Sequence, residues 1–216
     1  MKLLCLSDVE SKVVYSTQIR ERFGKTDIAI SCGDLPYPYL EYVISMLDIP
    51  LYYVHGNHLT IIETPQDELR LHPWGGVNLH RKVVYDKVNN LLIAGIEGSL
   101  RYNEGPKQYS QFQMWLMVME MVPKLLLNKL RYGRFLDCFV SHSPATGIHA
   151  QDDYAHRGVH AFRWLLRWFS PKLHLHGHVH LYMPNQPRET LFHQTRVVNA
   201  YKFIELELNS ETNFCV

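Results

Sequence analysis

Three short apolar segments in the N-terminal part of the chain constrain the fold most. They span residues 2–7, 27–32 and 50–55, and each has the continuous apolar character of a strand that is buried on both faces. Between them the sequence predicts two helices, one capped by Ser11 and the other running from a proline-rich turn to about Leu47. This β-α-β-α-β pattern predicts a parallel sheet that is covered by helices on at least one face.

All three predicted strands end on polar residues. The strand ends are Asp8, Gly33-Asp34 and Gly56-Asn57-His58. In open α/β sheets, ligand sites form beyond the carboxyl ends of the parallel strands. We therefore expect these side chains to converge on one site.

A second group of candidate residues is rich in histidine. His142 follows the apolar segment 135–140, and Gly177-His178-Val179-His180 follows an alternating Leu-His strand at 173–176. With Asp8, Asp34 and Asn57, these residues form a mixed oxygen and nitrogen donor set that suits first-row divalent metals. Two ions about 3.5–4 Å apart that share one carboxylate would use the whole set. Taken alone, the histidine-rich stretch has a second interpretation, a solvated strand edge.

The remaining segments predict the other layers of the fold. Short strands are expected at 77–80, 82–86 and 91–96, closing antiparallel strands at 189–193, 196–200 and 203–208, and helices at 107–131 and 158–169. Pro123 is expected to kink or split the longer helix, and the charges of Glu120 and Lys124 argue against a membrane span. We interpret this helix as one member of a buried helix pair, with a homo-oligomer surface at 107–131 as the alternative.

Composition narrows the classes of function. The 216 residues fit one domain, 1–216, with 209–216 as a loose C-terminal tail. The chain has 22 Lys and Arg against 21 Asp and Glu, so nothing in the charge balance indicates a nucleic-acid partner. Four cysteines without CxxC spacing and an N-terminus without a signal peptide predict free thiols in a reducing compartment, the cytoplasm, and no membrane partner.

The ordered motifs resemble those of the calcineurin-like metallophosphoesterase superfamily. The family pattern is D-x-H, GD, GNH, a lone histidine and GHxH. Here it stands as Asp8-Val9-Glu10, Gly33-Asp34, Gly56-Asn57-His58, His142 and Gly177-His178-Val179-His180. The resemblance spans residues 8 to 180. It implies an α/β fold, a four-layer α/β/β/α sandwich of two mixed β-sheets flanked by helices.

The resemblance also implies a role for each matched residue. Asp34 would bridge two divalent metal ions, with Asn57, His142 and His178 completing one site and Asp8 and His180 the other. The expected ions are of the Mn or Fe class, with Zn or Ni as alternatives. A hydroxide bridging the metals would be the nucleophile, and His58 would be the catalytic residue that assists the leaving group. The implied activity is hydrolysis of a small phosphorylated substrate, a monoester or a diester.

Two departures from the family pattern leave alternatives open. Glu10 stands where the family has histidine, so either Glu10 binds metal or that site is short of one ligand. Leu59 follows GNH where many relatives have an acidic residue, so a backbone carbonyl, Glu63 or Asp67 must orient His58.

The sequence is also compatible with other functions and suggests further contacts. The second hypothesis is a catalytically weak or inactive metal-binding scaffold of the same fold that binds a protein partner, and the third is an enzyme with one tightly held ion. Arg157 and Asn103 are the candidate substrate-binding residues. Tyr102 is considered beside Asn103, and His156 is expected to be a loop residue.

Overall fold

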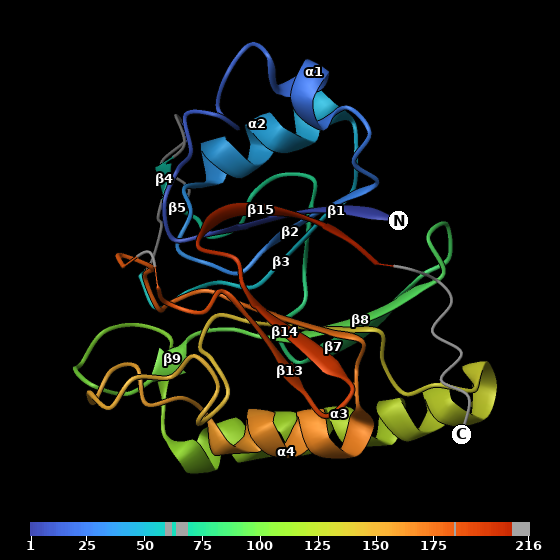
Figure 1. The fold of residues 1–216 in the computed structure, drawn as a ribbon, viewed down its shortest axis with the longest axis vertical. Helices are drawn as coiled ribbons and strands as arrows, with labels where there is room; N and C mark the ends of the chain where they lie inside the picture. The colour runs from blue at the N-terminus through green and yellow to red at the C-terminus, as the bar shows by residue number, and fades with distance from the viewer. Residues whose placement is uncertain (59–61, 64–68, 184, 209–216) are drawn as a thin grey trace.

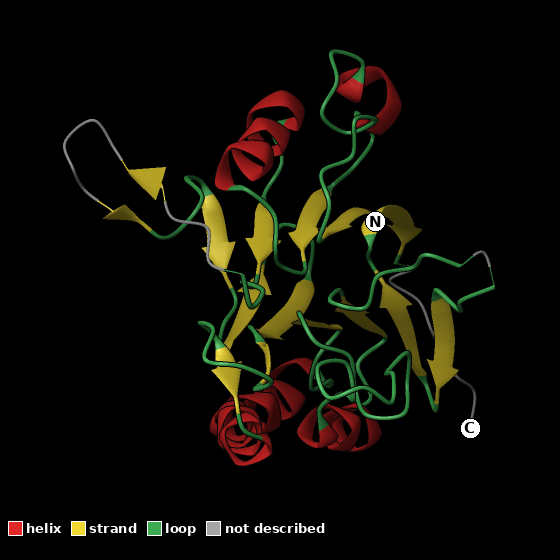
Figure 2. Ribbon diagram, turned by 90° about the vertical axis from the view of Figure 1, so that its left-hand side faces the viewer, coloured by secondary structure: helices red, strands yellow, loops and turns green. Residues whose placement is uncertain are grey.

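The structure, a computed structural model, describes residues 1–58, 62–63, 69–183 and 185–208. Two β-sheets pack face to face, with one pair of helices outside each sheet (Figure 1). The same four layers are seen along the sheets in Figure 2. The predicted four-layer sandwich of two mixed sheets is therefore confirmed. The predicted tail, 209–216, lies outside the described residues.

The first sheet holds the N-terminal strands that the sequence predicted. Its strand order is β15 (Lys202–Glu207), β1 (Lys2–Ser7), β2 (Ile28–Ser31), β3 (Leu51–Tyr53) and β6 (Gly76–Asn78). All neighbours are parallel except β15, which runs antiparallel to β1. Helices α1 (Ile19–Phe23) and α2 (Tyr37–Leu47) cover its outer face. A core that includes Leu4, Phe23 and Tyr39 fills the space between them.

The second sheet contains most of the remaining strands. Its order is β13 (Glu189–Phe192), β14 (Thr195–Asn199), β12 (Leu173–His176), β11 (Cys138–Ser141), β8 (Leu91–Ile96) and β7 (Lys82–Asp86). Helices α3 (Gln111–Tyr132) and α4 (His160–Phe169) pack on its outer face around a core that includes Phe139 and Phe162. Two short pairs complete the described strands, β4 (Ile62–Glu63) with β5 (Leu69–Arg70) and β9 (Ser99–Leu100) with β10 (Gln108–Tyr109).

A third core lies between the two sheets and contains three of the four cysteines. Cys5, Cys32 and Cys138 are free thiols and fully buried there, as the sequence predicted. Cys215 lies outside the described residues. In the described part of the chain, no helix is long and apolar enough to span a bilayer.

Several element predictions were wrong. The helix expected from Ser11 begins only at Ile19, because the Ser11 hydroxyl accepts the backbone N–H of Val13 in a turn instead of capping a helix. Each of the three C-terminal strands has an antiparallel neighbour as predicted, β13 with β14 and β15 with β1. The sequence did not show that β14 also pairs in parallel with β12, or that β15 joins the first sheet.

The long helix is also different from its prediction. It begins at Gln111 after a capping box on Ser110, and it continues through Pro123 to Tyr132 without splitting. Buried residues on both sides of the proline, Met121 and Leu125, pack into the core and hold the two halves together. One face of this helix is buried as predicted, but Leu126, Leu127 and Leu130 on the other face are exposed.

Candidate metal centre

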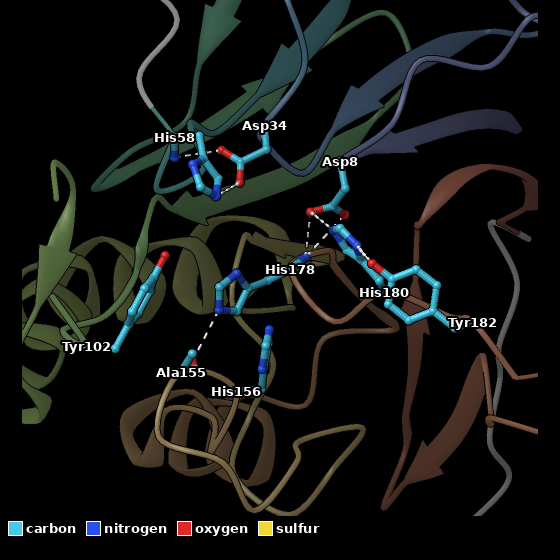
Figure 3. Close-up of a pocket in the computed structure, with 9 residues that line it drawn as sticks. All are labelled: Asp8, Asp34, His58, Tyr102, Ala155, His156, His178, His180 and Tyr182. Carbon is cyan, nitrogen blue, oxygen red and sulfur yellow. Dashed lines mark hydrogen bonds and ion pairs between the residues drawn. The ribbon is translucent and has the colours of Figure 1, made fainter.

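A pocket of about 510 Å³ opens where the carboxyl ends of the strands of both sheets meet. Figure 3 shows the residues that line it: Asp8, Asp34, His58, Tyr102, Ala155, His156, His178, His180 and Tyr182. Asp8 follows β1 and Asp34 follows β2, while His178 and His180 follow β12 of the other sheet. The structure therefore brings the predicted strand ends together, with Asn57 and His142 directly behind Asp34.

Three residues at this edge of the sheets have strained backbones. Asp8, Asp34 and His178 have φ values of 66°, 55° and 65°, which is the left-handed region that non-glycine residues rarely adopt. Gly56 passes so close that a Cβ on it would overlap Asp34 Oδ1. A site that fixes three strained residues beside a glycine is held by its surroundings, as is typical of functional sites.

His142, Asn57 and His178 form the inner group of candidate ligands, and His142 lies at its centre. His142 Nε2 is 3.1 Å from Asp34 Oδ2 and 3.0 Å from Asn57 Oδ1. Its Nδ1 lies 2.8 Å from the Cys32 carbonyl oxygen, which can only accept, so Nδ1 carries a proton. Nε2 is thereby aimed at the two oxygens, and the three atoms converge on one point.

The charges around His142 favour a positive charge at this point. Burial alone would lower the pKa of His142, but the charges of Asp34 and Asp8 raise it to about 9. Burial alone would raise the pKa of Asp34, yet His142 and the backbone N–H of His58 lower it. Burial is also the main reason that the pKa of Asp8 is raised. A proton on His142 balances the two carboxylates here, and a divalent cation can do the same.

Hydrogen bonds fix both the backbone and the ring of His178. Its backbone N–H donates to Asp8 Oδ1 at 3.0 Å, and its Nε2 donates to the Ala155 carbonyl oxygen at 3.2 Å. Burial and the neighbouring His142 lower the pKa of His178 to about 3, so its ring is neutral and Nδ1 keeps a free lone pair. The Ala155 carbonyl was not predicted, because a backbone acceptor leaves no signal in a sequence.

The outer group of candidate ligands, Asp8 and His180, is more open. His180 Nε2 lies 3.9 Å from Asp8 Oδ1, and its side chain is 36% exposed. Its Nδ1 is 2.6 Å from the hydroxyl of Tyr182, a residue that is itself 76% exposed and that sequence reasoning missed. The His180 ring stacks on Tyr201 at a centroid distance of 4.8 Å.

Glu10 lies outside the pocket. It is exposed, and its charge acts on Tyr39, whose pKa is raised to about 12 chiefly by burial and in smaller part by Glu10. The Tyr39 hydroxyl accepts the backbone N–H of Ser11. Glu10 is therefore near enough to α2 to act on Tyr39, and it is not among the residues that line the pocket.

The two candidate substrate contacts do not line the pocket either. The Arg157 guanidinium packs 4.3 Å from the centre of the Tyr154 ring. Asn103 Oδ1 accepts from the Gly105 backbone and the Gln108 side chain, so it stabilises its own loop.

Tyr102, the neighbour of Asn103, faces the pocket instead. Its hydroxyl accepts from Asn57 Nδ2 at 2.8 Å, which turns Asn57 Oδ1 toward His142. His156 also lines the pocket, and its Nδ1 is 2.8 Å from Asp153 Oδ1.

His58 lies at the rim of the pocket. Its backbone N–H donates to Asp34 Oδ1 at 2.9 Å, while its Nε2 is 4.0 Å from Asp34 Oδ2 and its side chain is 78% exposed. The Leu59 and Asp67 positions and the Glu63 side chain, which bear on how His58 is oriented, lie outside the described residues.

Comparison with known proteins identifies the fold. No protein-family model and no curated protein matches the chain. One crystal structure matches with a TM-score of 0.63 and 14% identity over 95% of this chain and 94% of that chain. TT1561 of Thermus thermophilus matches with a TM-score of 0.57 and 15% identity over 93% and 89%. Vps29 from Entamoeba histolytica gives a TM-score of 0.44 at 12% identity over 97% and 87%, which adds no support.

At these sequence identities the matches show a shared fold only. The chemistry of the site must be inferred from the residues at the pocket. Two residues of the pocket and one directly behind it stand out by geometry. Asp8, Asp34 and His142 each offer one ligand atom, and these atoms all lie within 4.8 Å of one another. The pocket is thus a candidate metal centre on a sandwich fold that solved proteins share.

Proposed function

We propose that this chain is a metal-dependent phosphoester hydrolase of the calcineurin-like type, with a centre for two divalent ions of the Mn or Fe class. The observation that carries the proposal is the convergence of ligand atoms of Asp8, Asp34 and His142 within 4.8 Å. The order of the five motifs and the shared sandwich fold support it. The pocket volume of about 510 Å³ suits a small phosphorylated substrate.

The residues present fit such a centre. Asp34 offers a ligand atom within 4.8 Å of those of Asp8 and His142. We assign it as the ligand shared by both ions, with Asn57, His142 and His178 for one ion and Asp8 and His180 for the other. The free nitrogen lone pairs and carboxylate oxygens are the donors that first-row divalent ions prefer. When bound, two such ions supply Lewis acidity to a phosphoryl group and lower the pKa of coordinated water.

The protein itself contributes positioning and proton transfer. His58 stands exposed at the rim, where its imidazole can donate a proton to a leaving oxygen, while its backbone N–H fixes Asp34. The Tyr102 hydroxyl accepts from Asn57, so its own proton can be donated to a phosphoryl oxygen in the pocket.

A second candidate function is favoured by the position of Glu10. Because Glu10 is exposed and does not line the pocket, Asp8 and His180 are the only predicted ligands of the outer group that line it among the described residues. A weakly held outer ion would suit a metal-binding scaffold with little catalytic activity that binds a protein partner, or an enzyme with a single tightly held ion.

Metal content and turnover test these functions together. We expect two ions per chain by elemental analysis and Mn-stimulated turnover of bis-p-nitrophenyl phosphate, with p-nitrophenyl phosphate as the monoester comparison. His58→Ala and Asp34→Asn should strongly reduce turnover, while His160→Ala, which replaces an exposed histidine of α4, serves as the matched control. One ion per chain with turnover would indicate the single-ion enzyme. Equal inactivity of wild type and His58→Ala on both esters would favour the scaffold.

A further inference from the structure

The second sheet has an open edge at β7, since within the described residues no strand pairs with its outer side. Leu92 of the neighbouring strand β8 accepts from the Asp137 backbone and donates to the Asp137 side chain, so its backbone groups point away from β7. The register pairs Tyr85 with Leu92 and Val83 with Ala94. Because bonded and non-bonded positions alternate in antiparallel pairs, Val83 and Tyr85 direct their N–H and C=O groups outward.

A groove of about 340 Å³ runs between this edge strand and the C-terminal half of α3. It is lined by Val83, Val84, Tyr85, Lys124, Leu127, Asn128, Arg131 and Tyr132. The rings of Tyr85 and Tyr132 lie 4.5 Å apart, and Leu127 is 55% exposed. The groove therefore offers an apolar and aromatic surface beside unpaired backbone groups.

The groove and its rim carry positive charge. Lys124 and Arg131 of α3 and Lys82 of β7 form no ion pair with any carboxylate of the described residues. The nearby acidic residues are already engaged: Glu120 binds Arg81, and the buried Asp86 accepts from Val88 and Asn89. A ligand with carboxylates is the chemical complement of this surface.

We propose that an extended, acidic segment of a partner protein binds this groove by adding a strand to the β7 edge. Backbone groups at Val83 and Tyr85, two residues apart, have the spacing of one side of an antiparallel or parallel ladder. Acidic side chains of the segment meet Lys124 and Arg131, and apolar side chains pack on Leu127. A second copy of this chain fits less well, because pairing two β7 edges brings the same cations together.

A labelled peptide tests the charge complementarity. The probe is an acetylated, amidated hexapeptide of alternating glutamate and valine, with a lysine–valine peptide of equal length as control, followed by fluorescence anisotropy. Reversing both charges with Lys124→Glu and Arg131→Glu should weaken binding about tenfold. Lys12→Glu with Lys25→Glu makes the same change in net charge at exposed positions before and after α1 and should leave binding unchanged.

Amide hydrogen exchange tests the strand addition itself. The Val83 and Tyr85 amides should exchange quickly in the free protein and become protected with the glutamate–valine peptide, while Val84, bonded to β8, is protected in both states. Equal binding of the lysine–valine peptide, or binding without protection of Val83 and Tyr85, would overturn the proposal. A dimer seen by light scattering that excludes the peptide would assign the edge to a second copy and overturn it as well.

Discussion

The residues of the proposed metal centre fall into an inner and an outer group, and the fold holds the two groups differently. In the inner group, His142 is fully buried, its Nδ1 donates to the Cys32 carbonyl, and Asn57 is turned by Tyr102. In the outer group, His180 is 36% exposed and its Nδ1 partner is the still more exposed Tyr182. Ligands fixed by buried partners lose less freedom when an ion binds. We therefore expect the inner ion to be held more tightly than the outer one.

The largest effect is expected at the residue that the two groups share. Asp34→Asn removes the carboxylate that is proposed to bind both ions, so both ions should be lost and turnover should fall on the order of 10³-fold. Elemental analysis and bis-p-nitrophenyl phosphate turnover measure this. Asp27→Asn makes the same carboxylate-to-amide change at an exposed position and serves as the control. Retention of both ions in Asp34→Asn would contradict a shared ligand.

Removing one histidine from each group compares the groups directly. His142→Ala should weaken binding of the tighter ion about 100-fold, whereas His180→Ala should weaken only the looser ion, by about tenfold. Calorimetric titration of metal-free protein with Mn separates the two binding events. If His180→Ala weakens the tighter event more than His142→Ala does, the assignment of inner and outer ions is reversed.

The stability of the metal-free protein should depend on pH, because buried histidines at the site differ in the direction of their pKa shifts. His142 has its pKa raised to about 9, so the stability it contributes is complete below pH 6.5 and is lost as the pH rises toward 9. His178 and His176 have pKa values lowered to about 3, chiefly by burial, so stability also falls as the pH drops below 6.5. Thermal melts in chelator should peak near pH 6.5. His142→Gln should remove the decline on the alkaline side, and persistence of that decline would count against the buried imidazolium.

Much of the fold and of the inner group could be predicted because local sequence determines them. Continuous apolar strands and the polar residues at their ends placed Asp8, Asp34 and Asn57 at one edge, as the structure shows. The start of α1 could not be predicted, because Ser11 forms a turn whose contacts with Tyr39 are distant in sequence.

The walls of the pocket depend on loops and were harder to predict. The loop that carries Tyr102 is held by the Gln108 side chain, which accepts from the backbones of Tyr102 and Asn103. That contact points Tyr102 into the pocket and keeps Asn103 out, a choice that residue type does not reveal. Tyr182 and the Ala155 carbonyl also come from loops whose course is set by tertiary packing.

Replacing Tyr102 and Tyr182 compares a tyrosine that orients a ligand of the inner group with an exposed tyrosine beside the outer group. Tyr102→Phe leaves Asn57 free to rotate, so the tighter ion should bind about tenfold more weakly. Tyr182→Phe removes only an exposed partner of His180 and should change the looser ion about two- to threefold. Mn titration gives both affinities, and the ratio of kcat to KM effects for each variant shows whether Tyr102 also touches substrate. Unchanged affinity of the tighter ion in Tyr102→Phe would show that Asn57 is held without it.

The smallest effect is expected where the outer group lacks a ligand. Glu10 is exposed and does not line the pocket, so Glu10→His removes no pocket-lining side chain and introduces an imidazole two residues after Asp8. If the backbone at residues 8–10 can bring that ring to the outer ion, its affinity should rise a few-fold while the inner ion is unaffected. Glu21→His, at an exposed position of α1, gives the same chemical change far from the pocket. Only the affinity for the outer ion should change in a Mn titration. If both affinities are unchanged, residue 10 is not the reason that the outer group binds weakly. The exposure of His180 would then explain the difference between the two groups.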